Sequence, residues 1–508
     1  MPHPWFNFIA SWLLKKRIHQ MELFIKYPIE VQLELMLDLL GVASNTEVGK
    51  KYDFSSINNY QEFRERIPLV EYEQIAGQID RCRKGEQNIF WPSQIKWFAK
   101  SSGTTNDRSK FIPVSTQALE SCHYKAGKDM LCLYYNNNPK SKLLAGKNLR
   151  LGGSHELHHK YNSYYGDLSA IIIDNLPFWA ELSSTPNQAV SLMGEWESKM
   201  RAIVKKTVKQ RVTGMAGVPS WMLSLLNEIL RSTSKDNIKQ VWPTLEVYFH
   251  GGVSFKPYRS QFERLIPQSD FKYYEIYNAS EGFLAIQDRN FEHDLLLMLD
   301  YGIFYEFIPL GSGEKAAEDK IVALDGVEIG PQYEIVLTTN AGLWRYRIGD
   351  TVVFTSLSPY RIRVTGRTKS HINAFGEELI VDNAEKALER VNQKHQSQIS
   401  DYTVAPIFMG NGKKGSHEWV IEFKSPPEDI NEFMRDLDLS LQNLNSDYQA
   451  KRYKDITMEM PVVHIVRENL FYDWLASKNK LGGQHKVPRL SNSREYVEQI
   501  LHFDSNTT

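Results

Sequence analysis

The chain has 508 residues, of which 42% are hydrophobic and 24% are charged. At about 150 residues per domain this length predicts two to four domains, and the composition is that of a globular protein rather than a disordered one. Lysine and arginine (60 residues) balance aspartate and glutamate (61 residues). Proteins that bind nucleic acid usually carry a basic surplus, so we expect no nucleic-acid partner.

Three cysteines, Cys82, Cys122 and Cys132, form an odd set with no CxxC pair. This pattern excludes a disulfide framework and a thiolate zinc site, and it fits a reducing compartment. Residues 5–14 are the most apolar stretch near the start, whereas a membrane span needs about 20 apolar residues. Basic residues follow this stretch instead of preceding it, which is the reverse of a signal peptide. We expect a helix that docks on the protein's own core, no membrane partner and a cytoplasmic location.

Helical patterns dominate the first 90 residues or so, and strands alternate with helices from there to about residue 360. An amphipathic run predicts a helix over residues 30–40 that ends at Gly41, and a second helix is predicted around 56–66. Apolar or β-branched runs predict strands at 170–173, 245–250, 271–276, 334–338 and 350–355. Longer helical patterns cover 191–209 and 221–230. Strands interleaved with helices predict an α/β architecture.

The pattern changes after Arg363. Helices are predicted at 383–396 and 429–444, and strands at 402–409, 418–423 and 462–466. These elements form a small α+β unit, and its join to the rest falls near residues 365–373. We therefore expect an N-terminal domain over residues 1–365 and a C-terminal domain over residues 366–508.

Two motifs are weak indicators of function. Residues 410–415 match G-x-G-x-x-G, but they precede an apparent strand instead of a helix, so a hairpin turn is favoured over a dinucleotide site. His155, His158 and His159 cluster in one stretch, but their spacing matches no standard zinc site. We favour a polar loop for these histidines and leave their role open.

A run of small hydroxylic residues follows the apolar segment IKWFA. It consists of Ser101, Ser102, Gly103, Thr104 and Thr105, with Lys110 shortly after. Backbone amides and hydroxyls in such a loop can wrap phosphate oxygens, and a lysine adds a point charge. An ordinary Ser/Thr/Gly turn is the alternative.

A second motif, YNASEG, follows a strand-like segment and comprises Tyr277, Asn278, Ala279, Ser280, Glu281 and Gly282. A tyrosine at a strand end can stack on a base, and the carboxylate of Glu281 can ligate magnesium. The alternative is a strand exit followed by a turn.

Two further motifs lie close to the predicted domain join. In YRIGD, Asp350 could accept hydrogen bonds from two ribose hydroxyls; the alternative is a hairpin salt bridge between Arg347 and Asp350. In GRTK, Arg367 and Lys369 follow Gly366 at the join itself.

The order of these four motifs resembles the adenylate-forming enzymes, which activate carboxylates with ATP. Gly251 and Gly252, after the strand-like EVYFH, resemble the glycine turn that those enzymes place near the nucleotide, and GGQHKVPR supplies a C-terminal lysine, Lys486. Within that superfamily the chain is most similar to the Gretchen Hagen family of acyl-acid amido synthetases, through SSGTT, YNASEG, YRIGD and QHKVPR. The resemblance covers about residues 5–490. The stretch GRTKSHINAFGEELI looks less like the plant members, which favours a bacterial-type branch.

The resemblance implies a large N-terminal mixed α/β domain with a β-barrel portion and a small, mobile α+β C-terminal lid. It implies ATP and magnesium as cofactors and, as partners, a small carboxylic acid and an amino acid or other amine. The phosphates would be held by residues 101–105 and Lys110, and magnesium by Glu281. Tyr277 and the Gly251–Gly252 turn would hold adenine, with Asn278, Ala279 and Ser280 as further cofactor-binding residues, while Asp350 and Arg367 would fix the ribose. Lys486 would stabilise the transition state, with Lys369 as the second catalytic candidate, and residues 217–221 would line the acyl site.

Two alternatives remain beside an amido synthetase. An acyl-CoA ligase would share the adenylation step and pass the acyl group to a thiol. A non-catalytic nucleotide-binding regulator would bind ATP without chemistry, although it would be free to lose Lys486. The motifs specify neither the acid nor the amine, nor the oligomeric state.

Overall fold

The computed structural model describes residues 16–101, 110–152, 158–176, 178–193, 196–253, 255, 258–310, 318–368, 371–410, 414–455, 457–478 and 487–507. Within these ranges no helix is long and apolar enough to cross a membrane. The three cysteines are buried and unbridged.

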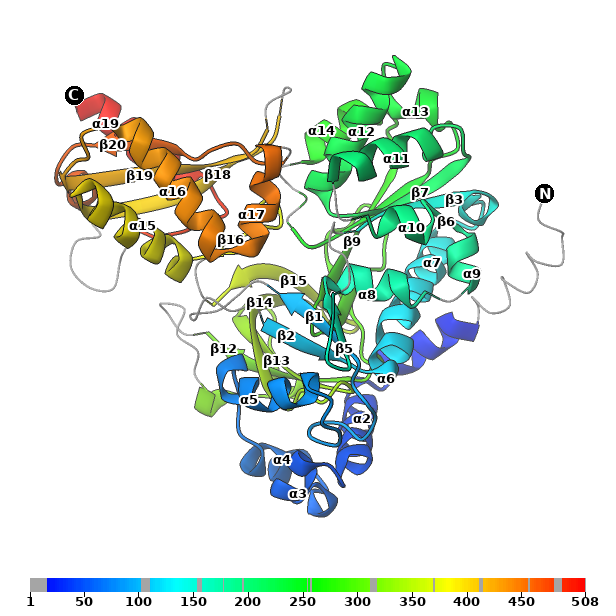
Figure 1. The fold of residues 1–508 in the computed structure, drawn as a ribbon. Helices are drawn as coiled ribbons and strands as arrows, with labels where there is room; N and C mark the ends of the chain where they lie inside the picture. Colours follow the sequence, from blue (N-terminus) through cyan, green and yellow to red (C-terminus); the bar gives the residue numbers. More distant parts are fainter. Residues whose placement is uncertain are drawn as a thin grey trace.

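Helices near the N-terminus cover one end of the molecule (Figure 1). Residues 16–26 are helical, and the helices that follow are α2 (Pro28–Ala43), α3 (Glu47–Lys51), α4 (Tyr60–Arg66) and α5 (Tyr72–Arg83). Met21 and Phe24 are buried, as the docking helix predicts, while its part at 5–14 lies outside the described residues. Helix α2 continues past Gly41, because an α-helix accepts a glycine at a modest cost.

The largest sheet contains eleven of the described strands in the order β12-β13-β14-β15-β11-β10-β9-β8-β7-β3-β6. Strands β3, β6, β7, β8 and β9 pair in parallel and the remainder antiparallel, so the sheet is mixed. This order is linear over the described strands and does not confirm the expected barrel portion. The bounds are β3 (Lys147–Leu151), β6 (Ser184–Thr185), β7 (Val212–Gly217), β8 (Val247–His250), β9 (Lys272–Ala279), β10 (Gly282–Gln287), β11 (Leu295–Leu297), β12 (Ile303–Pro309), β13 (Gln332–Thr339), β14 (Tyr346–Leu357) and β15 (Tyr360–Arg367).

A second sheet, β2-β1-β5-β4, lies beside the large one, and helices surround both. Its strands are β1 (Trp97–Ser101), β2 (Lys110–Val114), β4 (His158–Lys160) and β5 (Ser163–Gly166). The helices are α6 (Thr116–Ala118), α7 (Lys125–Asn137), α8 (Leu168–Asp174), α9 (Phe178–Leu182), α10 (Gln188–Ser191), α11 (Trp196–Thr207), α12 (Pro219–Thr233), α13 (Ile238–Val241) and α14 (Arg259–Leu265). Short helical turns are η1 (Phe54–Ser56), η2 (Leu119–Tyr124), η3 (Leu143–Ala145), η4 (Glu318–Lys320) and η5 (Leu324–Gly326).

One predicted strand is wrong. Residues 170–173 belong to helix α8, which buries Leu168, Ala170 and Ile171. A short continuous apolar run fits a buried helix as well as a buried strand, and periodicity alone does not separate them. The other predicted strands of this region are confirmed within β8, β9, β13 and β14.

The C-terminal elements form a three-layer unit. Strands β18 (Gln398–Ile407), β19 (Ser416–Ser425) and β20 (Val462–Val466) form its sheet. Val404 and Trp419 face a core with α15 (Val381–His395) and α16 (Ile430–Leu444), whereas their neighbours Ala405 and Val420 face α18 (Leu470–Ser477) and α19 (Glu495–Thr507). Side chains of a strand point alternately to its two faces, and here both faces are covered. The remaining elements are β16 (His371–Ile372), β17 (Leu379–Ile380), α17 (Ser446–Arg452) and η6 (Tyr453–Asp455).

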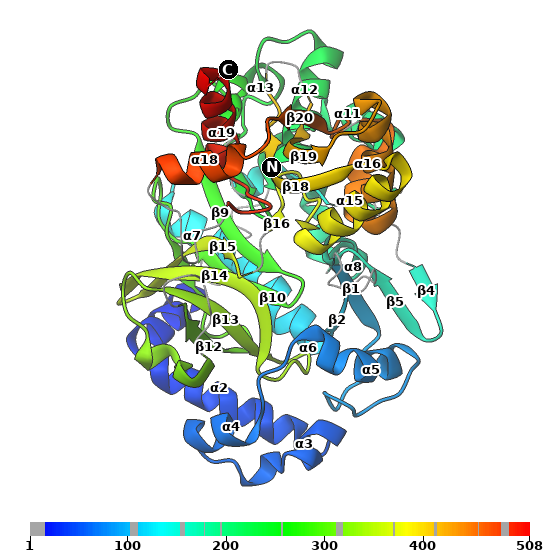
Figure 2. The ribbon, with the colours of Figure 1, turned by 90° about the vertical axis from the view of Figure 1, so that its left-hand side faces the viewer.

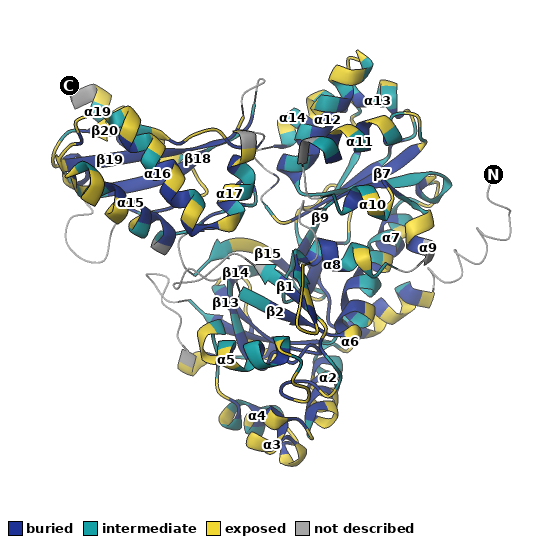
Figure 3. Cartoon of the chain, viewed as in Figure 1, coloured by how far each residue is buried: buried dark blue, intermediate teal, exposed yellow. Residues whose placement is uncertain are grey.

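The G-x-G-x-x-G motif joins β18 to β19, which pair antiparallel from Ile407 opposite Ser416. It therefore belongs to a strand-to-strand connection, as predicted, although residues 411–413 lie outside the described ones. The strands of this unit are buried, and much of the outer surface of α15 and α16 is exposed (Figure 3).

The C-terminal unit packs directly on the neighbouring helices α12 and α14 (Figures 1 and 2). The Tyr258 hydroxyl donates a hydrogen bond to the Ala374 carbonyl, and its ring lies 6.0 Å from that of Phe408. The Gln261 amide donates to the carbonyl of Met409. These contacts make one continuous apolar core across the two parts, so the unit rests on the large part of the chain instead of hanging from a linker.

Candidate functional site

Tyr277 lies near the end of β9, which a two-residue turn (Ser280 and Glu281) joins to β10. Ala279 pairs with Gly282 across this hairpin. A Cβ on Gly282 would approach the Cδ1 atom of Ile303 to 2.5 Å, so the Ile303 side chain packs closely against the last glycine of YNASEG. The local structure of YNASEG is therefore the end of a strand followed by a turn, which was the alternative predicted from the sequence.

The turn faces a buried carboxylate. The Tyr277 hydroxyl donates a 2.6 Å hydrogen bond to Asp350, a residue that is 7% exposed. Asp350 lies directly opposite Arg367 across the β14–β15 pair, and the Arg367 Nε donates to its other oxygen at 2.6 Å. The Asp350 charge raises the pKa of Arg367 above its usual value. Burial and the same carboxylate raise the pKa of Tyr277, which therefore stays protonated and acts as a donor.

The predicted alternative for Asp350 is wrong. Arg347 pairs with Glu334, with a contact of 2.7 Å, and not with Asp350. The two side chains of the YRIGD motif thus leave the strand in different directions: Arg347 supports β13, and Asp350 joins Tyr277 and Arg367. Each Asp350 oxygen keeps a further lone pair beyond these two bonds, which is what a ribose hydroxyl would need.

Glu281 and Lys110 extend this group. Burial and the neighbouring Asp350 charge raise the pKa of Glu281, while Lys110 and Arg367 oppose the shift. The half-buried Glu281 carboxylate thus lies near the charges of Lys110, Arg367 and Asp350. A divalent cation fits such a site, because it would neutralise the charges of both carboxylates at once. Described residues offer no cluster of three or more His, Cys, Asp or Glu, so a metal here would depend on phosphate oxygens for further ligands.

The predicted phosphate loop connects two paired strands. Ser101 ends β1 and Lys110 begins β2, and the two residues are opposite one another. Ser102, Gly103, Thr104 and Thr105 lie outside the described residues, as does the side chain of Ser101. Ser101 and Lys110 thus flank the predicted phosphate loop on paired strands, and Lys110 is the cation that acts on Glu281.

Gly251 and Gly252 follow β8 at the carboxyl end of the parallel strands. A Cβ on Gly251 would come within 2.5 Å of the Ile276 carbonyl oxygen, and Gly252 has a φ of +84°. Both positions therefore require glycine, one for close approach and one for backbone conformation. The carboxyl ends of parallel strands are where α/β proteins bind ligands, and Tyr277 on the adjacent β9 lies at the same edge.

A second charged group, which no sequence motif indicates, lies between the C-terminal unit and strand β1 at the base of the predicted phosphate loop. Burial and the charge of Glu378 raise the pKa of Asp447 to about 7, with Lys451, Asp167 and Lys100 also acting on it. Lys451 lies 4.1 Å above the Trp221 ring, so the group reaches the predicted acyl segment. Glu378 also approaches Arg367 at 3.9 Å, which connects the two groups. No motif contains these residues together, because they come from four separate elements or loops.

The remaining predicted residues lie outside the described part of the chain or elsewhere on its strands. Lys369 and Lys486 lie outside the described residues, as does His155. His158 and His159 are exposed on β4, where their rings contact Tyr165 and Tyr164. Asn278, Ala279 and Ser280 are half-buried on the hairpin that carries Tyr277 and Glu281.

Three family models match the chain in succession. The GH3 family N-terminal domain matches residues 17–271, the GH3 family central domain residues 296–367 and the GH3 family C-terminal domain residues 382–495. Among curated relatives, the indole-3-acetic acid-amido synthetase GH3.4 of Arabidopsis thaliana is 22% identical, over 93% of this chain and 91% of its own. The 4-substituted benzoates-glutamate ligase GH3.12 of the same plant is 22% identical, over 92% and 94%.

Solved structures share the fold. The acyl acid amido synthetase AtGH3.15, in complex with 2,4-DB, matches with a TM-score of 0.60 and 18% identity over 93% of both chains. A 2-hydroxyisobutyryl-CoA ligase, in complex with 2-HIB-AMP and CoA, matches with a TM-score of 0.58 and 13% identity over 95% of this chain and 93% of its own. The mixed α/β fold is therefore that of the adenylate-forming enzymes, a group whose activity implies the use of ATP.

Proposed function

The chain belongs to the GH3 family, and from that premise we propose that it is an AMP-forming ligase that joins a carboxylic acid to an amine, with an amino acid as the favoured acceptor. In the first step the carboxylate attacks the α-phosphate of ATP, which gives an acyl-adenylate and pyrophosphate. In the second step the amine attacks the acyl carbon, which gives an amide and AMP. The named relatives are amido synthetases and ligases.

The observation that carries this proposal is the convergence of Tyr277, Asp350 and Arg367 beside Glu281 and Lys110. Two of the family-like motifs meet through 2.6 Å hydrogen bonds at the Asp350 carboxylate, although they are far apart in the sequence. Tyr277 and Arg367 hold this carboxylate in place, so that its free lone pairs can orient the ribose. Because these polar groups are already in place, little free energy is spent on rearranging them when the substrate binds.

The chemical difficulty is the approach of an anionic carboxylate to polyanionic ATP. Charge that develops on the phosphate oxygens must be met by cations and amide dipoles. We assign Lys110 and the loop at residues 101–105 to the phosphates, and Lys486 and Lys369 to the transferring group. Magnesium, held by Glu281 and phosphate oxygens, would supply further charge neutralisation. Gly251, Gly252 and Tyr277 would hold the adenine, and Asn278, Ala279 and Ser280 are further candidates for contact with the cofactor.

We further propose that residues 1–365 form the catalytic body and residues 366–508 the lid, and that the protein works in the cytoplasm. Strand β15 ends at Arg367, which supports a boundary close to this point. Buried, unbridged cysteines fit a reducing compartment.

The test is to identify the product. The full chain would be incubated with ATP, magnesium and a panel of aryl and alkyl acids, with an amino acid panel or with CoA as acceptor. We expect AMP formation that needs an acid and an amino acid, and an amide in the mass spectrum. A thioester in place of the amide would establish the CoA ligase. ATP binding with no AMP under any combination would favour the non-catalytic regulator.

A further inference from the structure

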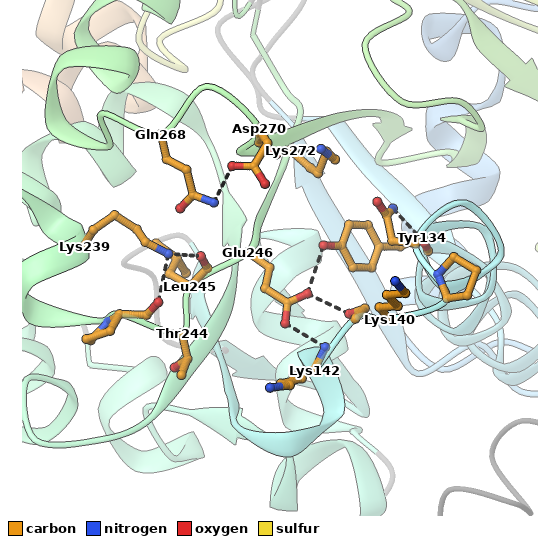
Figure 4. A pocket seen from close by; sticks show the side chains of 14 residues that line it. Tyr134, Lys140, Lys142, Lys239, Thr244, Leu245, Glu246, Gln268, Asp270 and Lys272 are labelled. Carbon is orange, nitrogen blue, oxygen red and sulfur yellow. Dashed lines mark hydrogen bonds between the residues drawn. The ribbon is translucent and has the colours of Figure 1, made fainter.

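A cavity of about 650 Å³ lies at the opposite edge of the parallel strands from the candidate site (Figure 4). Glu246 directly precedes β8 and Lys272 begins β9, whereas Gly251 and the Ser280–Glu281 turn follow the same two strands. At about 3.3 Å per residue, the length of β8 puts the two edges roughly 16 Å apart. The cavity is thus separate from the site described above.

Lysines dominate the charge of this cavity. Lys140, Lys142, Lys239 and Lys272 line it, against two carboxylates, Glu246 and Asp270. Four ammonium groups around one cavity repel each other unless anions lie between them. The cavity therefore carries a positive excess although the whole chain has a net charge of −1.

The two carboxylates are already engaged with the protein. Glu246 accepts hydrogen bonds from the Tyr134 hydroxyl at 3.2 Å, the Ser141 hydroxyl at 2.8 Å and the Lys142 backbone N–H at 2.7 Å. Asp270 accepts a 2.6 Å bond from the Gln268 amide, and this bond lowers the pKa of Asp270. Figure 4 shows the Glu246 carboxylate turned toward Tyr134 and Lys142. These acids stabilise the loops that form the walls and pair with no lysine ammonium group through a direct salt bridge among the described residues.

The lysines divide into an anchored pair and a free pair. Lys239 is half-buried and donates to the carbonyls of Pro243 and Leu245 at 2.9 and 2.8 Å. Lys272 donates to the Asp270 carbonyl at 2.6 Å and lies 4.4 Å from the Phe291 ring centroid. Backbone carbonyls thus fix two ammonium groups without neutralising them. The side chains of Lys140 and Lys142 are exposed and have no hydrogen bond or ion pair within the described part of the chain.

We propose that this cavity binds a small oxyanion with two or more negative charges, a phosphate or a polycarboxylate. Lys239 and Lys272 form preoriented contacts at its wall, and Lys140 and Lys142 close on the ligand from the rim. This proposal does not depend on the enzymatic activity of the chain.

Isothermal titration calorimetry on the full chain at low ionic strength tests it, with citrate, inorganic phosphate and acetate as separate probes. We expect citrate or phosphate to bind and acetate, which has one charge, not to bind at the same concentration. Citrate alone would identify a carboxylate ligand, and phosphate alone a phosphate ligand. Added sodium chloride should weaken binding, because the rim charges are exposed to screening.

Variants locate the bound anion. The double variant Lys140→Ala/Lys142→Ala should lower the affinity at least about tenfold, without loss of the folded state because both side chains are exposed. Lys320→Ala/Lys424→Ala removes the same charge from exposed positions elsewhere and should bind like the unmodified chain. Lys110→Ala tests the candidate active site and should leave the affinity unchanged. The proposal is overturned if neither polyanion binds, if acetate binds equally well, if Lys140→Ala/Lys142→Ala binds normally, or if Lys110→Ala abolishes binding.

Discussion

Asp350 is the residue on which the nucleotide assignment depends most. Its carboxylate accepts from Tyr277 and Arg367 at 2.6 Å each, and it is almost fully buried. Asp350→Ala should raise the KM for ATP about 10- to 150-fold, because hydrogen bonds to a charged group contribute about 1.5–3 kcal/mol. Steady-state kinetics with ATP and 2′,3′-dideoxy-ATP measures this effect, and the variant should lose its preference for ATP.

Tyr277→Phe is the matched control for that variant. It removes one hydrogen bond to Asp350 but keeps the ring and the carboxylate, so the preference for ATP over 2′,3′-dideoxy-ATP should persist. If Asp350→Ala discriminates between the two nucleotides as well as the unmodified chain does, Asp350 does not contact the ribose.

Glu281 carries the magnesium assignment. Glu281→Gln keeps the shape of the side chain and removes its charge, so turnover should fall strongly while the melting temperature changes little. The measurement is AMP formation as a function of magnesium concentration. Glu292→Gln, an exposed change beyond the end of β10, should be neutral. Unchanged turnover of Glu281→Gln at saturating magnesium would rule out the role.

At the scale of elements, the turn after β8 requires glycine at position 251, and this requirement can be tested. Gly251→Ala places a Cβ within 2.5 Å of the Ile276 carbonyl oxygen, so the turn or β9 must shift. We expect a loss of stability of about 1–3 kcal/mol and a raised KM for ATP. Gly41→Ala is the control: its Cβ meets nothing within 4 Å inside helix α2, and it should stabilise the chain by up to about 1 kcal/mol. Thermal unfolding and ATP kinetics are measured on both variants. A Gly251→Ala variant with unchanged stability and an unchanged KM for ATP would refute the requirement.

Some of the elements could be predicted from sequence patterns and others could not. Long periodic segments such as α12, α15 and α16 were predictable, because an amphipathic helix repeats its apolar face over several turns. Residues 170–173 were not, because four apolar residues cannot distinguish a helical period from a buried strand. In the site, contiguous motifs located Tyr277, Glu281, Asp350 and Arg367. Asp447, Lys451 and Glu378 have no such signal, because only the packing of α17 beside α12 and the β16–β17 region brings them together.

At the scale of the whole molecule, the two half-reactions should need different positions of the C-terminal unit. Lys486 would approach the α-phosphate during adenylation and leave while the amine enters, with Gly366 (φ +144°) absorbing the backbone change. Lys486→Ala should therefore lose adenylation by about two orders of magnitude or more. It should still convert a supplied acyl-adenylate and amine to amide at close to the normal rate.

Rapid-quench measurements of the two half-reactions test this separation. Equal loss in both would mean that the change damages docking of the lid, and no loss in either would make Lys486 a surface lysine. Movement of the unit must also break the Tyr258–Ala374 hydrogen bond and the Tyr258–Phe408 ring contact, so the observed arrangement is one stable position of the two parts.

Adenylate formation is the central claim, and exchange of radiolabelled pyrophosphate into ATP measures it most directly. The full chain would be supplied with ATP, magnesium, labelled pyrophosphate and one carboxylic acid at a time, without any amine or CoA. We predict exchange that depends on the acid, is strongly reduced in Glu281→Gln and needs no acceptor, because the first step is complete and reversible before the second begins. Absence of exchange with every aryl and alkyl acid of a broad panel, or exchange that proceeds equally without acid, would contradict the claim.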